Sequence, residues 1–273
     1  MSAAQTQSLF SRLWQQYTEL TPSAQKIHDL FQNAGEPNII NDHIAFRTFD
    51  DARVNIDVLK QPFIKLGYEE KGEYVFTDKK LFAKHYEHPT DKTLPKIFIS
   101  QLESNKLSAT VQQMVKACVD AIPASELNAD DLLLKGRLWG TPNYALYEKL
   151  SAESEYAAWM YVYGFCPNHF TVFVNYLKHF ETLESVNNFL KEKGYKLNVS
   201  GGEIKGSPGE LLEQSSTLAE QRDIQFEEGV FKIPSVYYEF ARRYEDEKGE
   251  LYHGFIAASA DKIFESTDRK LAQ

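Results

Sequence analysis

Two histidines and one glutamate have the residue types and the settings of a metal site. His43 and His169 each stand near the start of a short aromatic segment with strand character, and Glu239 stands between Tyr238 and Phe240 in a third such segment. A carboxylate buried among aromatic side chains is costly unless it is paired or ligates a metal. Two imidazoles and one carboxylate on one side of a divalent ion suit non-haem Fe(II) oxygenases, and zinc accepts the same ligands. The three residues therefore predict a metal site without fixing the metal.

Four further polar residues are candidates for substrate binding. Arg47 lies four residues after His43, so the two side chains face the same side of the expected strand. This placement makes Arg47 the best substrate contact, whereas on its own it would equally be a salt-bridged surface residue. Gln214 and Ser216 share a face if their segment is extended, and Arg243 falls on the same face as the predicted carboxylate ligand. The alternative for these last three is a hydrogen-bonded core and a solvated charge.

The segments that carry the two histidines belong to an internal repeat. Residues 42–48 and 168–175 both begin with a polar residue and a histidine and continue as an aromatic, alternating strand. A helical pattern follows each, and its closing glycine, Gly67 or Gly194, comes 24 residues after His43 and 25 residues after His169. Later strand-like segments occupy corresponding places, 97–102 in the first copy and the closing strands 229–231 and 235–240 in the second. We interpret the chain as two diverged copies of a βαββ-type module, whose pairing about a pseudo-twofold axis would bring the histidines together.

The remaining segments are expected to be helical. Apolar residues recur at helical spacing in residues 1–40, which we interpret as a helical preface, and in residues 104–165, which we interpret as a helical insertion. Module 1 then covers residues 41–103 and module 2 covers residues 166–273. No boundary is rich in Ser, Gly or Pro, which favours a single cooperative α+β domain over residues 1–273.

Composition excludes several classes of protein. The 273 residues include 30 Lys and Arg against 39 Asp and Glu, a net charge of −9, and no long basic cluster, so a nucleic-acid partner is disfavoured. No apolar run is long enough to cross a bilayer, and residues 1–7 lack the order of a secretory signal, so we expect a cytoplasmic protein without a membrane partner. Cys118 and Cys166 have no CxxC partner. His85 and His88 lack a local third ligand, and we expect them to have a structural role or to support a metal ligand from behind.

Several motifs, in their order along residues 10–270, resemble the 2-oxoadipate dioxygenase/decarboxylase family. They are residues 41–47, 85–89, 95–100, 212–217 and 237–239. The resemblance implies a fold similar to the vicinal oxygen chelate superfamily, with a curved sheet around a metal site. It also implies that His43, His169 and Glu239 hold Fe(II), and that Arg47 contacts a substrate carboxylate. Zinc or nickel could occupy the same ligands after purification.

The function implied by this resemblance is an Fe(II)- and O₂-dependent reaction on a 2-oxo dicarboxylic acid. The family converts 2-oxoadipate to 2-hydroxyglutarate and releases CO₂, so the expected partners are a small 2-oxo acid and O₂. Two alternatives remain open from the residues themselves. One is another divalent-metal enzyme on the same scaffold, an isomerase or a hydrolase, and the other is a non-catalytic protein that binds a small ligand.

Overall fold

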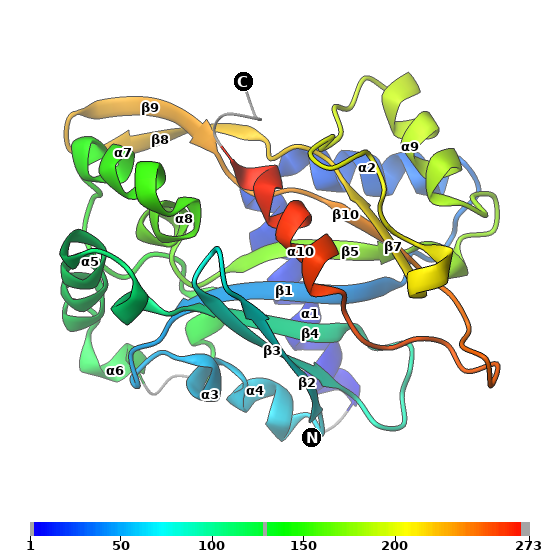
Figure 1. Ribbon diagram of the computed structural model, residues 1–273, viewed down its shortest axis with the longest axis horizontal. Helices are drawn as coiled ribbons and strands as arrows, with labels where there is room; N and C mark the ends of the chain where they lie inside the picture. The colour runs from blue at the N-terminus through cyan, green and yellow to red at the C-terminus, as the bar shows by residue number, and fades with distance from the viewer. Residues whose placement is uncertain (1–2, 128–129, 269–273) are drawn as a thin grey trace.

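The computed structural model describes residues 3–127 and 130–268, and in these ranges eight strands form one mixed sheet (Figure 1). From one edge to the other the sheet order is β2 (Glu69–Phe76), β3 (Leu81–Glu87), β4 (Lys96–Leu102), β1 (Asn41–Phe49), β5 (Pro167–Phe173), β10 (Glu239–Arg243), β7 (Leu212–Ser216) and β6 (Lys205–Ser207). Two more strands, β8 (Gln221–Phe226) and β9 (Gly229–Pro234), form a separate antiparallel hairpin.

The sheet order is symmetrical about its centre. β1 and β5 pair antiparallel there, β4 runs parallel to β1, and β10 runs parallel to β5. Two diverged modules therefore sit side by side in one curved sheet, as the repeat predicted. The structure adds β3, which the sequence pattern did not reveal because His85 and Glu87 occupy buried positions and interrupt the apolar alternation. The segment at residues 229–231, predicted as a closing strand of module 2, lies in the separate hairpin instead.

Several helices begin at a polar cap and bury an apolar stripe. The preface forms α1 (Ala3–Leu20) and α2 (Pro22–Asn33), and short helices α3 (Ile56–Leu59) and α4 (Gln61–Lys65) follow β1. In module 2, α9 (Leu183–Glu192) starts at a capping box between Thr182 and Ser185 and buries Leu183, Val186 and Leu190. None of the helices in the described ranges combines the length and the apolarity that a membrane span requires.

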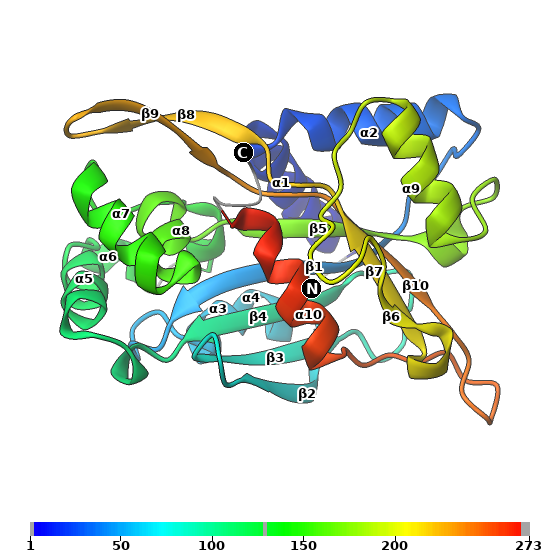
Figure 2. The same cartoon turned by 45° about the horizontal axis from the view of Figure 1, so that its top comes forward.

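Strand alternation divides the sheet into an outer and an inner face. On the outer face, α1 packs Trp14 against Phe170, α2 packs Phe31 against Phe240, and α4 packs Phe63 against Phe46 at ring separations of 5.1, 6.0 and 5.6 Å. The inner face therefore carries the alternate residues, which include both histidines and Glu239. α10 (Ala257–Phe264) lies across this inner face (Figures 1 and 2) and packs against β2 at one edge and β6 and β7 at the other.

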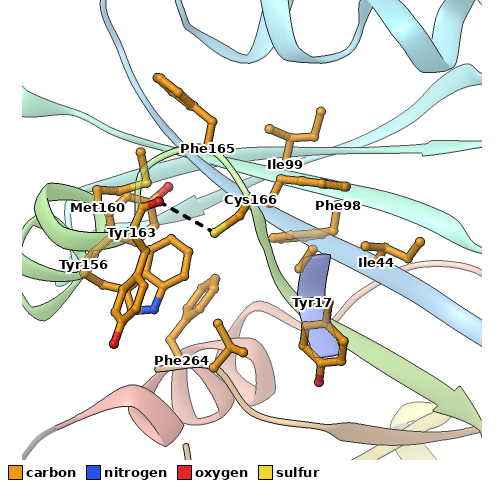
Figure 3. Packing of buried hydrophobic residues seen from close by; sticks show 14 of the residues in the cluster. Tyr17, Ile44, Phe98, Ile99, Tyr156, Met160, Tyr163, Phe165, Cys166 and Phe264 are labelled. Atoms are coloured by element: carbon orange, nitrogen blue, oxygen red, sulfur yellow. Dashed lines mark hydrogen bonds between the residues drawn. The ribbon is translucent and has the colours of Figure 1, made fainter. Parts of the chain in front are cut away.

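The helical insertion, residues 104–165, contacts both modules at one end of the sheet. It forms α5 (Ala109–Asp120), α6 (Ala124–Leu127), α7 (Tyr144–Glu153) and α8 (Glu155–Tyr163). From α8, Tyr156 donates to the carbonyl of Ser100 in module 1 and Trp159 donates to the carbonyl of Ser235 in module 2, at 2.8 and 2.7 Å. Figure 3 shows Tyr156 and Tyr163 of α8 gathered near Cys166 and Phe264.

We expect Gly164→Ala to destabilise the protein strongly. Gly164 ends α8 at φ +67°, and a Cβ there would lie 2.4 Å from the carbonyl oxygen of Gly136. The combined strain and backbone clash should lower the free energy of unfolding by about 3 kcal/mol or more in urea denaturation. Gly194→Ala is the matched control, because Gly194 has φ +86° with nothing within 4 Å of the added Cβ, and should cost only about 1 kcal/mol. Equal losses of stability in the two variants would show that the close approach of Gly164 to Gly136 does not determine the cost.

Candidate metal centre

Three neighbouring strands bring the two predicted histidines and the predicted glutamate together. Thr171 of β5 pairs with His43 of β1 on one side and with Glu239 of β10 on the other, and His169 lies two residues before Thr171 on the same face. The Nε2 atoms of His43 and His169 are 3.3 Å apart. Oε2 of Glu239 lies 3.1 Å from Nε2 of His169, and Oε1 lies 3.6 Å from Nε2 of His43. One ligand atom from each residue falls within 4.8 Å of the others.

The residue before each histidine sets the orientation of its ring. Oδ1 of Asp42 lies 2.8 Å from Nδ1 of His43, and Oδ1 of Asn168 lies 3.0 Å from Nδ1 of His169. In the neutral rings Nδ1–H donates to these oxygens, so each Nε2 presents its lone pair to the centre. Such partners fix the tautomer of metal-ligating histidines. Both rings are thus prepared in the form that binds a metal.

Asp42 is itself held by a buried arginine. Nε and Nη2 of Arg243 donate to its two oxygens at 2.6 and 2.9 Å, and Nζ of Lys96 lies 4.0 Å away. Burial alone would raise the pKa of Asp42, but Arg243 and Lys96 hold this pKa well below its ordinary value. Asp42 therefore remains an acceptor for His43.

The three predicted ligands are buried, and burial shifts the pKa of each one toward its neutral form. Burial lowers the pKa of His43 and brings that of His169 well below its ordinary value, so both rings are neutral. Burial also raises the pKa of Glu239 to about 8, so without a cation this carboxyl group keeps its proton at neutral pH, and a bound cation would displace that proton. Gln214 donates to Oε1 of Glu239 at 2.7 Å, whereas Oε2 accepts no hydrogen bond from the described residues. Two neutral imidazoles beside an incompletely satisfied carboxyl group, which a divalent cation would deprotonate, fit a metal site.

The space beside these residues is small and covered. A cavity of about 20 Å³ is lined by the three residues, Gln214, Phe98, Phe255 and the α10 residues Ala260, Ile263 and Phe264. That volume holds roughly one water molecule. A substrate of several carbons can reach the centre only if side chains of α10 or of its flanking segments move.

Arg47 lies on the predicted face but lines a neighbouring pocket. Its guanidinium sits 4.9 Å from the ring centres of both Tyr156 and Trp159, and Nη2 donates to Oγ1 of Thr267 at 3.1 Å. Nη1 lies 3.5 Å from Oε2 of Glu155, too far for a strong hydrogen bond, and neither Nε nor Nη1 has a hydrogen-bond acceptor among the described residues. The pocket measures about 290 Å³, and Phe264 lines both it and the metal cavity.

The other three candidate residues are engaged within the protein. Gln214 lines the cavity but uses its amide nitrogen to hold Glu239, while Ser216 shares a hydrogen bond of 2.8 Å with Ser266. Arg243 holds Asp42 and donates to backbone carbonyls of residues 252 and 254. Their roles as substrate contacts stay predictions. Sequence reasoning missed the orienting roles of Asp42 and Asn168, although the repeat of a polar residue before each histidine contained the signal.

A family model and a curated relative that match this chain carry the same description. A family model described as 2-oxoadipate dioxygenase/decarboxylase matches residues 9–246. A curated relative from Arabidopsis thaliana, described as "2-oxoadipate dioxygenase/decarboxylase, chloroplastic", is 36% identical over 275 residues, which cover 92% of this chain and 74% of the relative.

Solved structures agree over nearly the whole chain. The crystal structure of a hydroxyglutarate synthase in complex with 2-oxoadipate from Oryza sativa is 32% identical, with a TM-score of 0.91 and coverage of 99% of this chain and 95% of that one. A structure described as a putative hydrolase from Shewanella frigidimarina NCIMB 400 is 49% identical, with a TM-score of 0.87 and coverage of 92% and 97%.

A more distant structure bears on the fold alone. It is described as a putative glyoxalase superfamily protein from Ralstonia eutropha JMP134 and is 19% identical, with a TM-score of 0.70 over 89% of this chain and 83% of that one. Together with the paired modules, it confirms the predicted α+β fold similar to the vicinal oxygen chelate superfamily.

We expect Asp42→Asn to weaken divalent metal binding by about 10- to 100-fold, because the charge that orients His43 is lost while the side-chain shape is kept. Isothermal titration of the metal-free protein with Zn²⁺ would measure the change. Asp29→Asn on the exposed side of α2 is the control and should leave the affinity within about twofold. Unchanged affinity in a folded Asp42→Asn variant would show that Asp42 does not support the metal centre.

Proposed function

The chain belongs to the 2-oxoadipate dioxygenase/decarboxylase family, as its motifs predicted, and on this premise we propose that it oxidatively decarboxylates a 2-oxo dicarboxylic acid. 2-Oxoadipate is the proposed substrate, with 2-hydroxyglutarate and CO₂ as products. The observation that carries the proposal is the convergence of His43, His169 and Glu239 in a buried cavity on the inner face of the sheet. One 2-oxoadipate and one O₂ contain the atoms of one 2-hydroxyglutarate and one CO₂, so the reaction needs no further reductant.

We propose Fe(II) as the metal that these three residues hold. Two imidazoles and one carboxylate form the donor set of many non-haem iron oxygenases, and zinc or nickel can take the same ligands in purified protein. When bound, Fe(II) supplies the one-electron chemistry that lets O₂ react with the 2-oxo acid. The protein contributes the fixed rings of His43 and His169, the orientation of Glu239 by Gln214, and a cover of aromatic and aliphatic side chains that excludes water.

Arg47 is the proposed contact for the distal carboxylate of the substrate. Two of its guanidinium nitrogens lack a hydrogen-bond acceptor among the described residues, and Phe264 is the side chain that lies between its pocket and the metal cavity. Four residues of strand separate His43 from Arg47 by roughly 13 Å, and the long arginine side chain reduces this span. A six-carbon diacid could then bridge the two spaces once Phe264 moves. A cytoplasmic location stays a prediction beside this proposal.

Reconstitution without oxygen tests the proposed reaction. Protein loaded anaerobically with Fe(II) should consume O₂ only when 2-oxoadipate is added, and should form CO₂ and 2-hydroxyglutarate in a ratio of one each per O₂. Glu239→Gln keeps the shape of the third ligand but removes its charge, and should lower kcat at least about 100-fold. An oxygen electrode and product analysis measure both. Turnover of 2-oxoadipate without O₂ would reject the oxygenase and favour a hydrolase or an isomerase.

Replacement of Arg47 tests the substrate contact separately. Arg47→Lys keeps the charge but loses the planar fork, so KM for 2-oxoadipate should rise about tenfold or more. 2-Oxohexanoate lacks the distal carboxylate, so its KM should already be high in the unmodified protein and should change little in the variant. Equal increases for both substrates would place Arg47 in a role other than carboxylate binding.

A further inference from the structure

A chain of hydrogen bonds runs from the edge of module 1 to the segment that precedes α10. The backbone N–H of Phe255 donates to the hydroxyl of Tyr74 at 3.1 Å, and this hydroxyl lies 2.9 Å from Nδ1 of His85. Nε2 of His85 in turn lies 3.1 Å from Oε1 of Glu87. Burial raises the pKa of Tyr74 to about 12, so the hydroxyl keeps its proton and can donate it to Nδ1 of His85. The opposite nitrogen then donates to Glu87.

The backbone leaves room for this arrangement. Gly72 of β2 pairs with His85 of β3, and a Cβ on Gly72 would lie 2.9 Å from Nδ1 of His85 and 3.0 Å from the hydroxyl of Tyr74. The first contact is closer than those that real Cβ atoms make, and the second is tighter than most of them. The glycine therefore serves the Tyr74–His85 hydrogen bond rather than a turn.

Phe255 connects the hydrogen-bond chain to the metal centre. Its ring contacts His43 edge to face at 4.9 Å and 90°, and its centre lies 5.2 Å from His85 and 5.0 Å from Phe98. The same ring lines the metal cavity. A change in the position of Phe255 would thus alter both the wall of the cavity and the packing on a predicted metal ligand.

The segment that carries Phe255 is fixed from a second side. Nη1 of Arg243 donates to the carbonyls of Tyr252 and Gly254 at 3.1 and 2.7 Å. α10 begins at Ala257, two residues after Phe255, and its other end supplies Ile263 and Phe264 to the cavity wall. The hydrogen bond from Phe255 to Tyr74 therefore helps to fix the position of the first turn of α10 on the inner face.

We infer that His85 is a positioning residue which, through Tyr74, holds Phe255 against His43 and seats α10 over the metal cavity. The inference rests on the proposed function in that it takes this cavity as the place of reaction. It assigns to His85, which stands outside the set of metal ligands, the task of keeping the cover closed around a bound substrate. Loss of the hydrogen bond should loosen the cover without removing a ligand.

Hydrogen exchange in the metal-free protein tests the structural half of the inference. Tyr74→Phe removes the hydroxyl alone, and amides of residues 253–264 should exchange about five- to tenfold faster, as expected for the loss of one partly buried hydrogen bond. Amides of β1 and β5 should keep their rates. Tyr86→Phe is the matched control on β3, because the buried Tyr86 hydroxyl has no hydrogen-bond partner among the described residues. Unchanged exchange in Tyr74→Phe, or faster exchange throughout the protein, would overturn the inference.

Kinetics of the Fe(II)-loaded enzyme test the functional half. Tyr74→Phe and His85→Leu should raise KM for 2-oxoadipate about fivefold or more with kcat within about twofold, and should consume more O₂ than they form 2-hydroxyglutarate. His85→Asn keeps an acceptor near the place of Nδ1 and should restore much of the KM. If amides of residues 253–264 exchange faster in Tyr74→Phe but KM is unchanged, the positioning role of His85 is overturned. Failure of the proposed function would appear instead as no O₂-dependent turnover in the unmodified enzyme, with the exchange result still standing.

Discussion

The burial of the Glu239 carboxylate between two neutral imidazoles is the constraint on which the rest of the structure depends. Such a group is unfavourable in an apolar interior unless a cation or hydrogen-bond donors compensate it. Gln214 satisfies one oxygen, and the second oxygen is left facing His169 without a hydrogen bond from the described residues. Nearby, Asp42 and Arg243 compensate each other. The uncompensated part of the site is therefore the part that a divalent ion would complete.

The paired modules supply this site unequally. His43 and His169 hold equivalent places in the repeat, so Ala45 and Thr171, each two residues later, are also equivalent. Ala45 pairs with Phe98 on the neighbouring strand, and Thr171 pairs with Glu239. Phe98 is therefore the counterpart of Glu239. One module thus contributes the carboxyl group of the predicted ligand where the other contributes an aromatic wall of the cavity. The second asymmetry lies behind the histidines, where Asp42 is charged and Asn168 is neutral. The three predicted ligands lie on one side of the centre, which leaves the other side for the proposed substrate and O₂, provided that the cover over the cavity can move.

Closure of the site depends on contacts made far from the ligands. α10 reaches both edges of the curled sheet, and Phe264 at its end lines both the metal cavity and the pocket of Arg47. The start of the same helix is fixed through Phe255 and Arg243. The predicted metal ligation and the proposed substrate enclosure therefore both depend on Arg243, which orients Asp42 behind His43 and holds the segment that precedes the cover. This sharing gives a physical reason for an arginine that is buried at this position.

The sequence by itself determined the repeat, the α+β class, the family and the three residues that converge, because strand periodicity and residue type are local properties that survive in the order of the chain. The even spacing of His43 and Arg47 placed both side chains on one face of the strand. That spacing does not determine which cavity each side chain enters. Only the tertiary structure decided that Arg243 would pair with Asp42 across 201 positions, that β3 would bring His85 beside Tyr74, and that α10 would cover the centre. These contacts join segments that are distant in sequence. Burial and strand register in the folded sheet determine them, and no local sequence pattern does.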